Sequence, residues 1–141
     1  MPTIQSITTP EDLRRCYPVI VQLRPHLTED SFVERALRQL KEQPYHLAAV
    51  IEDDRVTTVA GYRLGENLFS GRYLYVDDLV TDESVRSQGH GGLLFDWLVA
   101  QAREQRCTAL ELDSGVQRFD AHRFYLCKRM NIASHHFSLK L

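Results

Sequence analysis

The chain has 141 residues, a mass of 16.3 kDa and a formal net charge of −2. This length supports one hydrophobic core, so we expect a single domain over residues 1–141. Hydrophobic residues make up 43% and charged residues 26% of the chain, a balance typical of folded globular proteins and not of disordered ones. Because the net charge is slightly negative, a general nucleic-acid binder is not expected.

The sequence lacks the usual signals for membrane insertion, export or metal binding. No stretch approaches the roughly 20 apolar residues that a membrane helix needs. The N-terminus, Met1-Pro2-Thr3, is too polar for a signal segment, so we expect a cytoplasmic protein. The three cysteines are widely spaced and no CxxC or HxxxH motif is present, so we expect neither a disulfide framework nor a metal site.

Helix and strand signals alternate along the chain. Two helix starts are marked by a threonine cap followed by acidic residues, at Thr9 and at Thr28. Apolar residues at helical spacing predict a further helix over residues 91–106, and another is expected over 118–129. The expected strands cover residues 3–7, 45–52, 56–64, 72–81, 108–113 and 132–141. This order predicts an α/β (α+β) fold with a mixed, mostly antiparallel central sheet and helices on both faces.

The most informative segment follows the strand that ends near Thr81. A polar loop leads into Arg86-Ser87-Gln88-Gly89-His90-Gly91-Gly92, which opens directly into an amphipathic helix. Glycines at a helix start let backbone N–H groups approach a ligand closely, and the helix dipole favours an anion there. The segment therefore predicts a binding site for a pyrophosphate, with Arg86 adding positive charge.

Three kinds of phosphate loop compete for this segment. A Walker loop is excluded because no lysine follows the glycines. A dinucleotide fingerprint fits at Gly89 and Gly91 but has Leu94 where the last glycine belongs. The acetyl-CoA pattern [R/Q]-x-x-G-x-[G/A] is matched in full from Arg86 to Gly91.

This pattern, followed by a strand and by the helix element Ala121-His-Arg-Phe-Tyr125, resembles the GNAT superfamily of N-acetyltransferases. The resemblance covers residues 45–141 and, in outline, the helical N-terminus. It implies an acyl-CoA N-acyltransferase fold, acetyl-CoA as co-substrate, and direct transfer of the acetyl group to a primary amine in a ternary complex. Arg118 departs from the family, which commonly has asparagine at that position.

The resemblance also implies roles for individual residues. Tyr125 would protonate the leaving thiolate, and a carboxylate near the strand end, Asp77 or Asp78, would act as base. Because neighbours on a strand alternate faces, we expect only one of the two to point into a given cavity, and Asp78 is narrowly preferred. The residues expected to contact acetyl-CoA are Leu79, Val80, Thr81, Arg86, Ser87, Gln88, Gly89, His90, Gly91, Gly92 and Arg118.

Two other functions stay open at this point. The chain could be a CoA-binding or sensor module without chemistry, or a dinucleotide-binding module. The acceptor could be a small molecule, a peptide N-terminus or a protein lysine. A homodimer formed through the last strand or a sheet edge is a family expectation.

Overall fold

The computed structural model describes residues 1–141 and divides them into two compact units, residues 1–111 and 112–141. The first unit holds most of the sheet and three α-helices, and the second holds the last helix. The elements are β1 (Thr3–Ser6), α1 (Pro10–Leu23), α2 (Glu29–Glu42), β2 (Tyr45–Glu52), β3 (Arg55–Asn67), β4 (Gly71–Thr81), the 3-10 turn η1 (Glu83–Val85), α3 (His90–Glu104), β5 (Ala109–Leu112) and α4 (Phe119–Cys127).

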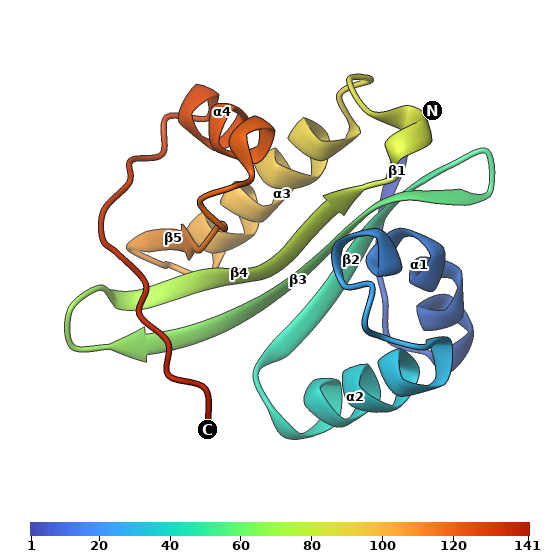
Figure 1. Ribbon diagram of the computed structural model, residues 1–141, viewed down its shortest axis with the longest axis horizontal. Helices are drawn as coiled ribbons and strands as arrows, with labels where there is room; N and C mark the ends of the chain where they lie inside the picture. Colours follow the sequence, from blue (N-terminus) through green and yellow to red (C-terminus); the bar gives the residue numbers. More distant parts are fainter. The chain divides into compact units, whose positions relative to one another are not determined.

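The strands form one sheet in the order β1-β2-β3-β4-β5. The pairs β1–β2, β2–β3 and β3–β4 are antiparallel. Figure 1 shows β5 running in the same direction as β4, so the sheet is mixed. The predicted fold class, a mixed and mostly antiparallel sheet with flanking helices, is confirmed.

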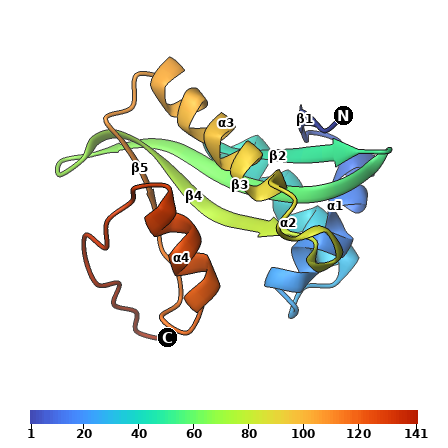
Figure 2. The ribbon, with the colours of Figure 1, turned by 90° about the horizontal axis from the view of Figure 1, so that it is seen from above.

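Helices cover both faces of the sheet within the first unit. Figure 2 shows α3 on one face and α1 with α2 on the other. Helix α3 packs against β2, β3 and β4, while α1 packs against β3 and β4 and α2 against β2. The core under α1 contains Leu13, Cys16 and Val19, and α3 buries Leu94 and Leu98 completely.

The predicted helix starts have the expected caps. Thr9 accepts a hydrogen bond from the Asp12 backbone N–H at 3.2 Å, with Pro10 in the first turn of α1. Thr28 and Ser31 form a reciprocal capping box at the start of α2. These caps fix where α1 and α2 begin.

One predicted strand is wrong. Residues 131–141 have no regular secondary structure, although the sequence predicts a strand over 132–141. The prediction rests on the alternation of Phe137 and Leu139 with polar residues. Alternation does not supply the neighbouring strand with which a backbone must pair.

None of the helices is both long enough and apolar enough to cross a lipid bilayer.

Candidate functional site

The glycine-rich segment starts helix α3 without any side-chain cap. Gly89 is the N-cap residue, with φ of 84°, a left-handed conformation that favours glycine. The first turn of α3 contains no acidic residue, so its free backbone N–H groups and the positive end of the dipole are not neutralised. Arg86, Ser87 and Gln88 lie beside it on the loop, and the Arg86 side chain makes no ion pair. The local geometry suits an anionic group such as a phosphate.

The loop from Asp82 to His90 is fixed at both ends to one residue of the sheet, Thr57. The Asp82 backbone N–H donates to the Thr57 carbonyl oxygen at 2.8 Å, and Thr57 Oγ1 lies 2.8 Å from His90 Nδ1. Thr57 is the extra residue at a register shift between β2 and β3, where Val50 pairs with Thr58 and Ile51 with Val56. A β-bulge of this kind re-aims a side chain, and here it directs Thr57 toward the loop.

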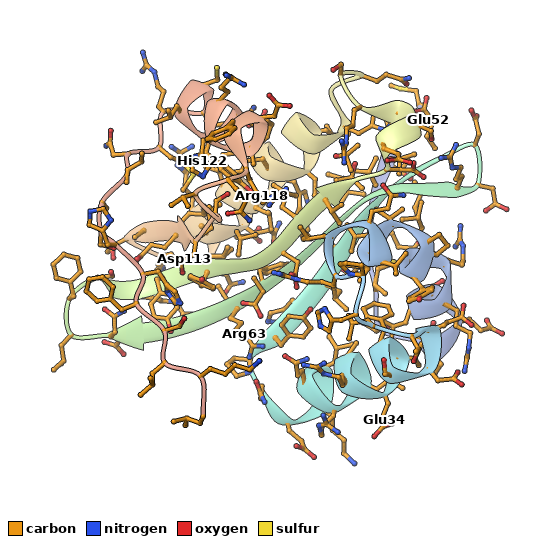
Figure 3. The ribbon with its side chains drawn as sticks, in the orientation of Figure 1. Glu34, Glu52, Arg63, Asp113, Arg118 and His122 are labelled. Carbon is orange, nitrogen blue, oxygen red and sulfur yellow. The ribbon has the colours of Figure 1, made fainter.

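His90 lies in the predicted loop, but its side chain is buried within the protein. It is 6% exposed, and its Nε2 lies 2.7 Å from the Glu52 carboxylate. Figure 3 labels Glu52 at the same end of the sheet as the loop. Only the backbone of His90 is therefore available to a ligand at the helix start.

Asp82 holds the other end of this loop. Its carboxylate accepts hydrogen bonds from the Ser84 backbone N–H and from Arg55, the latter at 2.6 Å. The backbone hydrogen bond from Ser84, followed by the contact with Arg55, lowers the pKa of Asp82 to about 2. Asp82 therefore remains charged at neutral pH. Its carboxylate is occupied by these hydrogen bonds, which hold the start of the loop in place.

The end of β4 is paired with β3 on one side. Leu79 pairs with Ala60, Val80 with Val59 and Thr81 with Thr58. On its other side β4 neighbours β5, which has only four residues against eleven in β4. The Thr108 N–H just before β5 donates to Arg72 near the start of β4. Strand β5 is thus too short to pair with the end of β4.

Asp77 and Asp78 both line the same cavity, which corrects the expectation that only one of them would. The pairing of β3 with β4 shifts by one residue here, because Gly61 pairs with Asp78 and Tyr62 with Val76. Asp77 is the extra residue of this bulge. Strict alternation of faces fails at a bulge, so two consecutive carboxylates reach one space.

Each of the two carboxylates is held by an arginine. Asp78 Oδ1 accepts a hydrogen bond from Arg24 Nε at 2.7 Å and forms an ion pair with Nη2 at 2.6 Å, while Nη2 donates to the Asp77 carbonyl oxygen. Asp77 Oδ2 accepts from Arg63 Nε at 2.8 Å. Figure 3 shows Arg63 on β3, and its other guanidinium nitrogens donate to Gln39 and Gln43 at the end of α2. The carboxylates are thereby fixed in position, each with one oxygen engaged by its arginine.

Burial changes the acid–base properties of this cluster. It raises the pKa of Asp77, and the hydrogen bond and charge of Arg63 oppose the effect. Burial together with the charges of Asp78 and Asp77 raises the pKa of the Tyr45 hydroxyl, which stays neutral. Asp77 is thus a carboxylate whose proton affinity exceeds that of an ordinary aspartate.

The second unit contains the two remaining predicted site residues. Arg118 is the N-cap residue of α4, and Tyr125 lies in the last two turns of that helix, with its ring centroid 5.4 Å from that of Phe124. Burial raises the pKa of Tyr125 and the charge of Arg118 opposes this change. Tyr125 is consequently a neutral phenol able to donate a proton.

Sequence reasoning missed Arg24, Arg63 and Tyr45. They come from the end of α1, from β3 and from the start of β2. No motif marks them, since they meet Asp77 and Asp78 only through the tertiary fold.

Comparisons with known proteins agree with this geometry. A model of the acetyltransferase (GNAT) family matches residues 8–130. An uncharacterized N-acetyltransferase of Bacillus subtilis, YhdJ, is 31% identical over 125 residues, which cover 89% of this chain and 88% of the relative. Aminoalkylphosphonate N-acetyltransferase of Salmonella typhimurium is 26% identical over 120 residues, covering 84% of this chain and 78% of the relative.

The fold also matches solved structures. The aminoglycoside N-acetyltransferase AAC(6′)-Iy in complex with CoA superposes with a TM-score of 0.89 over 100% of this chain and 95% of that chain. Its sequence is only 11% identical, so the likeness concerns the fold.

The anchor at Thr57 yields a prediction about stability. Thr57→Val keeps the side-chain shape but leaves His90 Nδ1 without its partner, and we expect a loss of about 1–3 kcal/mol in the free energy of unfolding. Urea unfolding followed by circular dichroism measures the change. Thr57→Ser, which keeps the hydroxyl, should lose less than Thr57→Val. Equal stability of the valine variant and the parent would show that this contact does not hold the loop.

Proposed function

Because the chain belongs to the acetyltransferase (GNAT) family and is an acyltransferase, we propose that it moves an acetyl group from acetyl-CoA to a primary amine by direct transfer. One observation carries this proposal: an uncapped glycine-rich helix start follows the strand whose end presents two carboxylates to a cavity. The first feature suits a pyrophosphate and the second suits an amine that must lose a proton.

In this proposal acetyl-CoA binds along the end of β4 and the start of α3. The backbone of Leu79 to Thr81 pairs with the extended pantetheine, and the N–H near Val80 polarises the thioester carbonyl. The pyrophosphate lies on the loop of Arg86, Ser87, Gln88, Gly89, His90, Gly91 and Gly92, and Arg118 adds a contact to the cofactor.

The chemistry proceeds without an acyl-enzyme. A carboxylate of the Asp77–Asp78 pair accepts a proton from the ammonium group of the acceptor, directly or through water. The amine nitrogen then forms a bond to the thioester carbon, giving a tetrahedral oxyanion. Its collapse breaks the C–S bond, Tyr125 donates its proton to the leaving thiolate, and the second proton lost by the nitrogen returns to Tyr125. The products are the N-acetylated amine, free CoA and the proton that the amine released.

The acceptor is proposed to be a small molecule. The cavity at Asp77 and Asp78 has a volume of about 490 Å³, within the range of small-ligand pockets. One relative is named for an aminoalkylphosphonate, which is a small amine. Between the carboxylates, the raised pKa of Asp77 favours that residue as base over Asp78, which the sequence narrowly preferred.

We further propose a cytoplasmic homodimer. Ile132, Phe137 and Leu139 in the irregular segment 131–141 are 75%, 90% and 84% exposed, and exposed apolar strips commonly mark a partner surface.

The role of Tyr125 separates an enzyme from a binding module. Tyr125→Phe removes the donated proton and should lower kcat by about 100-fold, as expected for the loss of a general acid. Free-thiol release from acetyl-CoA measures turnover. The acetyl-CoA affinity, measured by calorimetry, should stay within about twofold of the parent value.

Ligand choice provides the control. In thermal unfolding, acetyl-CoA at about 100 times its dissociation constant should stabilise the parent by roughly 2.7 kcal/mol, whereas NAD should have no effect. A shift with NAD alone would favour a dinucleotide-binding module. Binding of acetyl-CoA without turnover on any amine would favour a sensor module.

The pH profile tests Asp77. Its carboxylate must be deprotonated to act as base, so kcat/KM should rise with pH through the raised pKa of this group. Asp77→Asn should remove that rising limb and lower kcat/KM by at least about tenfold. Asp78→Asn is the matched variant and should retain the limb. Loss of the limb in Asp78→Asn alone would assign the base to Asp78.

The oligomeric state is tested by sedimentation velocity. A homodimer should sediment with a mass of about 33 kDa, twice the chain mass of 16.3 kDa. Replacing Phe137 and Leu139 together by serine should shift the protein toward the monomer. A parent protein that sediments as a monomer at all concentrations would contradict the proposal.

A further inference from the structure

The cavity at the end of β4 belongs entirely to the first unit. Its walls come from α1, the α1–α2 connection, α2, β2 and β4. Apolar side chains such as Ile20 and Phe32 form part of it. Its polar lining includes both cationic and anionic side chains: Arg24, His26, Arg35, Gln39, Tyr45, Asp77 and Asp78.

The negative charges of this cavity are already neutralised. Arg24 holds Asp78 through one hydrogen bond and a close ion pair, and Arg63 donates to Asp77 at 2.8 Å. The side chains of Asp78 and Asp77 are 18% and 22% exposed, so water screens these pairs only partly. Two carboxylates facing two guanidinium groups leave this cluster without a net negative charge.

Arg35 is an additional cation in the same lining. It lies on α2 and its guanidinium makes no ion pair and no hydrogen bond, although Gln39 donates to its backbone carbonyl. The neighbouring arginine on the helix, Arg38, differs because it pairs with Glu34 at 3.7 Å and does not line the cavity. Together with Arg63, which pairs with Asp77 from outside this lining, the cluster has one positive charge in excess, carried by the exposed Arg35.

Tyr45 supplies a second unused polar group. The residue is 6% exposed and lines the cavity, and its hydroxyl makes no hydrogen bond. The Arg63 guanidinium carbon lies 4.8 Å from the ring centroid, which fixes the ring. The phenol is neutral, and its hydroxyl is able to donate a hydrogen bond to an acceptor oxygen in the cavity.

A free guanidinium and a free phenol in one cavity are donors that suit a ligand oxygen, and the guanidinium suits a negatively charged one. We propose, on the basis of the acetyltransferase function given above, that the acceptor is a small primary amine that also carries an oxyanion. Its amine lies at Asp77 and Asp78, and its carboxylate or phosphonate group lies at Arg35. Polycationic amines are disfavoured, since they would place a second positive charge against Arg35.

A matched series of three-carbon amines tests the proposal. The series is 3-aminopropanoate, 3-aminopropylphosphonate, propylamine and 1,3-diaminopropane, each assayed by thiol release from acetyl-CoA. The first two distinguish a carboxylate from a phosphonate, propylamine has no second charge, and the diamine has the wrong charge. We expect kcat/KM for at least one anionic amine to exceed that for propylamine by about tenfold or more.

Variants at position 35 identify the residue responsible. Arg35→Ala should raise KM for the preferred anionic amine by about tenfold, with kcat and the propylamine kcat/KM nearly unchanged. Arg35→Lys should recover part of the loss, and Arg35→Glu should shift the preference toward 1,3-diaminopropane. Arg38→Ala is the control on the same helix and should have no effect. Thermal unfolding of each variant reports whether it is folded.

The outcomes separate this inference from the proposed function. Acetylation of propylamine or the diamine at rates equal to or above those of the anionic amines would overturn the inference and leave the acetyltransferase function standing. Identical behaviour of Arg35→Ala and Arg38→Ala would have the same consequence. Absence of turnover on every amine, together with absence of acetyl-CoA binding, would overturn both. Acetylation of a lysine-containing peptide in preference to all four amines would point to a protein acceptor and contradict the inference.

Discussion

The rest of the site depends on two β-bulges, one where the central strand β3 pairs with β2 and one where it pairs with β4. Each bulge inserts one extra residue into the pairing. In the ladder with β2 the extra residue is Thr57, and in the ladder with β4 it is Asp77. Regular pairing would send successive side chains to opposite faces. The two bulges instead direct Thr57 to the loop before α3 and bring Asp77 beside Asp78 in one cavity.

These two irregularities organise two separate polar regions of the first unit. On the α3 face, Thr57 fixes Asp82 and His90, the two ends of the glycine-rich loop. On the face covered by α1 and α2, the bulge at Asp77 places the carboxylates under Arg24 and Arg63. Each of these hydrogen bonds adds little free energy by itself. Their side chains are buried or half-buried, however, and there a polar group without a partner costs more free energy than the bond itself contributes. The strands thereby position an uncapped helix start and a charged cavity near the end of the same β4 strand.

The arginines change the electrical character of the cavity. A sequence with adjacent aspartates at a strand end suggests an acidic site for cations. In the fold, Arg24 and Arg63 neutralise these aspartates, and the unpaired Arg35 makes the net charge positive. Burial still raises the pKa of Asp77, because loss of hydration outweighs the favourable contact with Arg63. The site thus combines a carboxylate of raised proton affinity, Asp77, with a positively charged surrounding, and this combination depends on the arginines that the fold brings to it.

The sequence by itself determined the elements whose signals are local. The threonine caps at Thr9 and Thr28, the glycines at residues 89–92 and the apolar spacing of Leu94 and Leu98 predicted helices, the loop and the family resemblance correctly. Local signals suffice there because capping, dipole and amphipathic burial act within a few residues.

Only the tertiary structure decided which side chains meet. Arg24 and Asp78 are 54 positions apart in the chain, and Arg63 and Asp77 are 14 apart, so no spacing rule connects them. The bulge at Asp77 arises from the pairing with β3 and reversed the expectation that one aspartate would face away. The alternation in residues 132–141 predicted a strand that did not form, since strand formation depends on a partner elsewhere in space. Contacts between distant residues and the pairing of strands are properties of the folded chain, and they determined the charge and shape of this site.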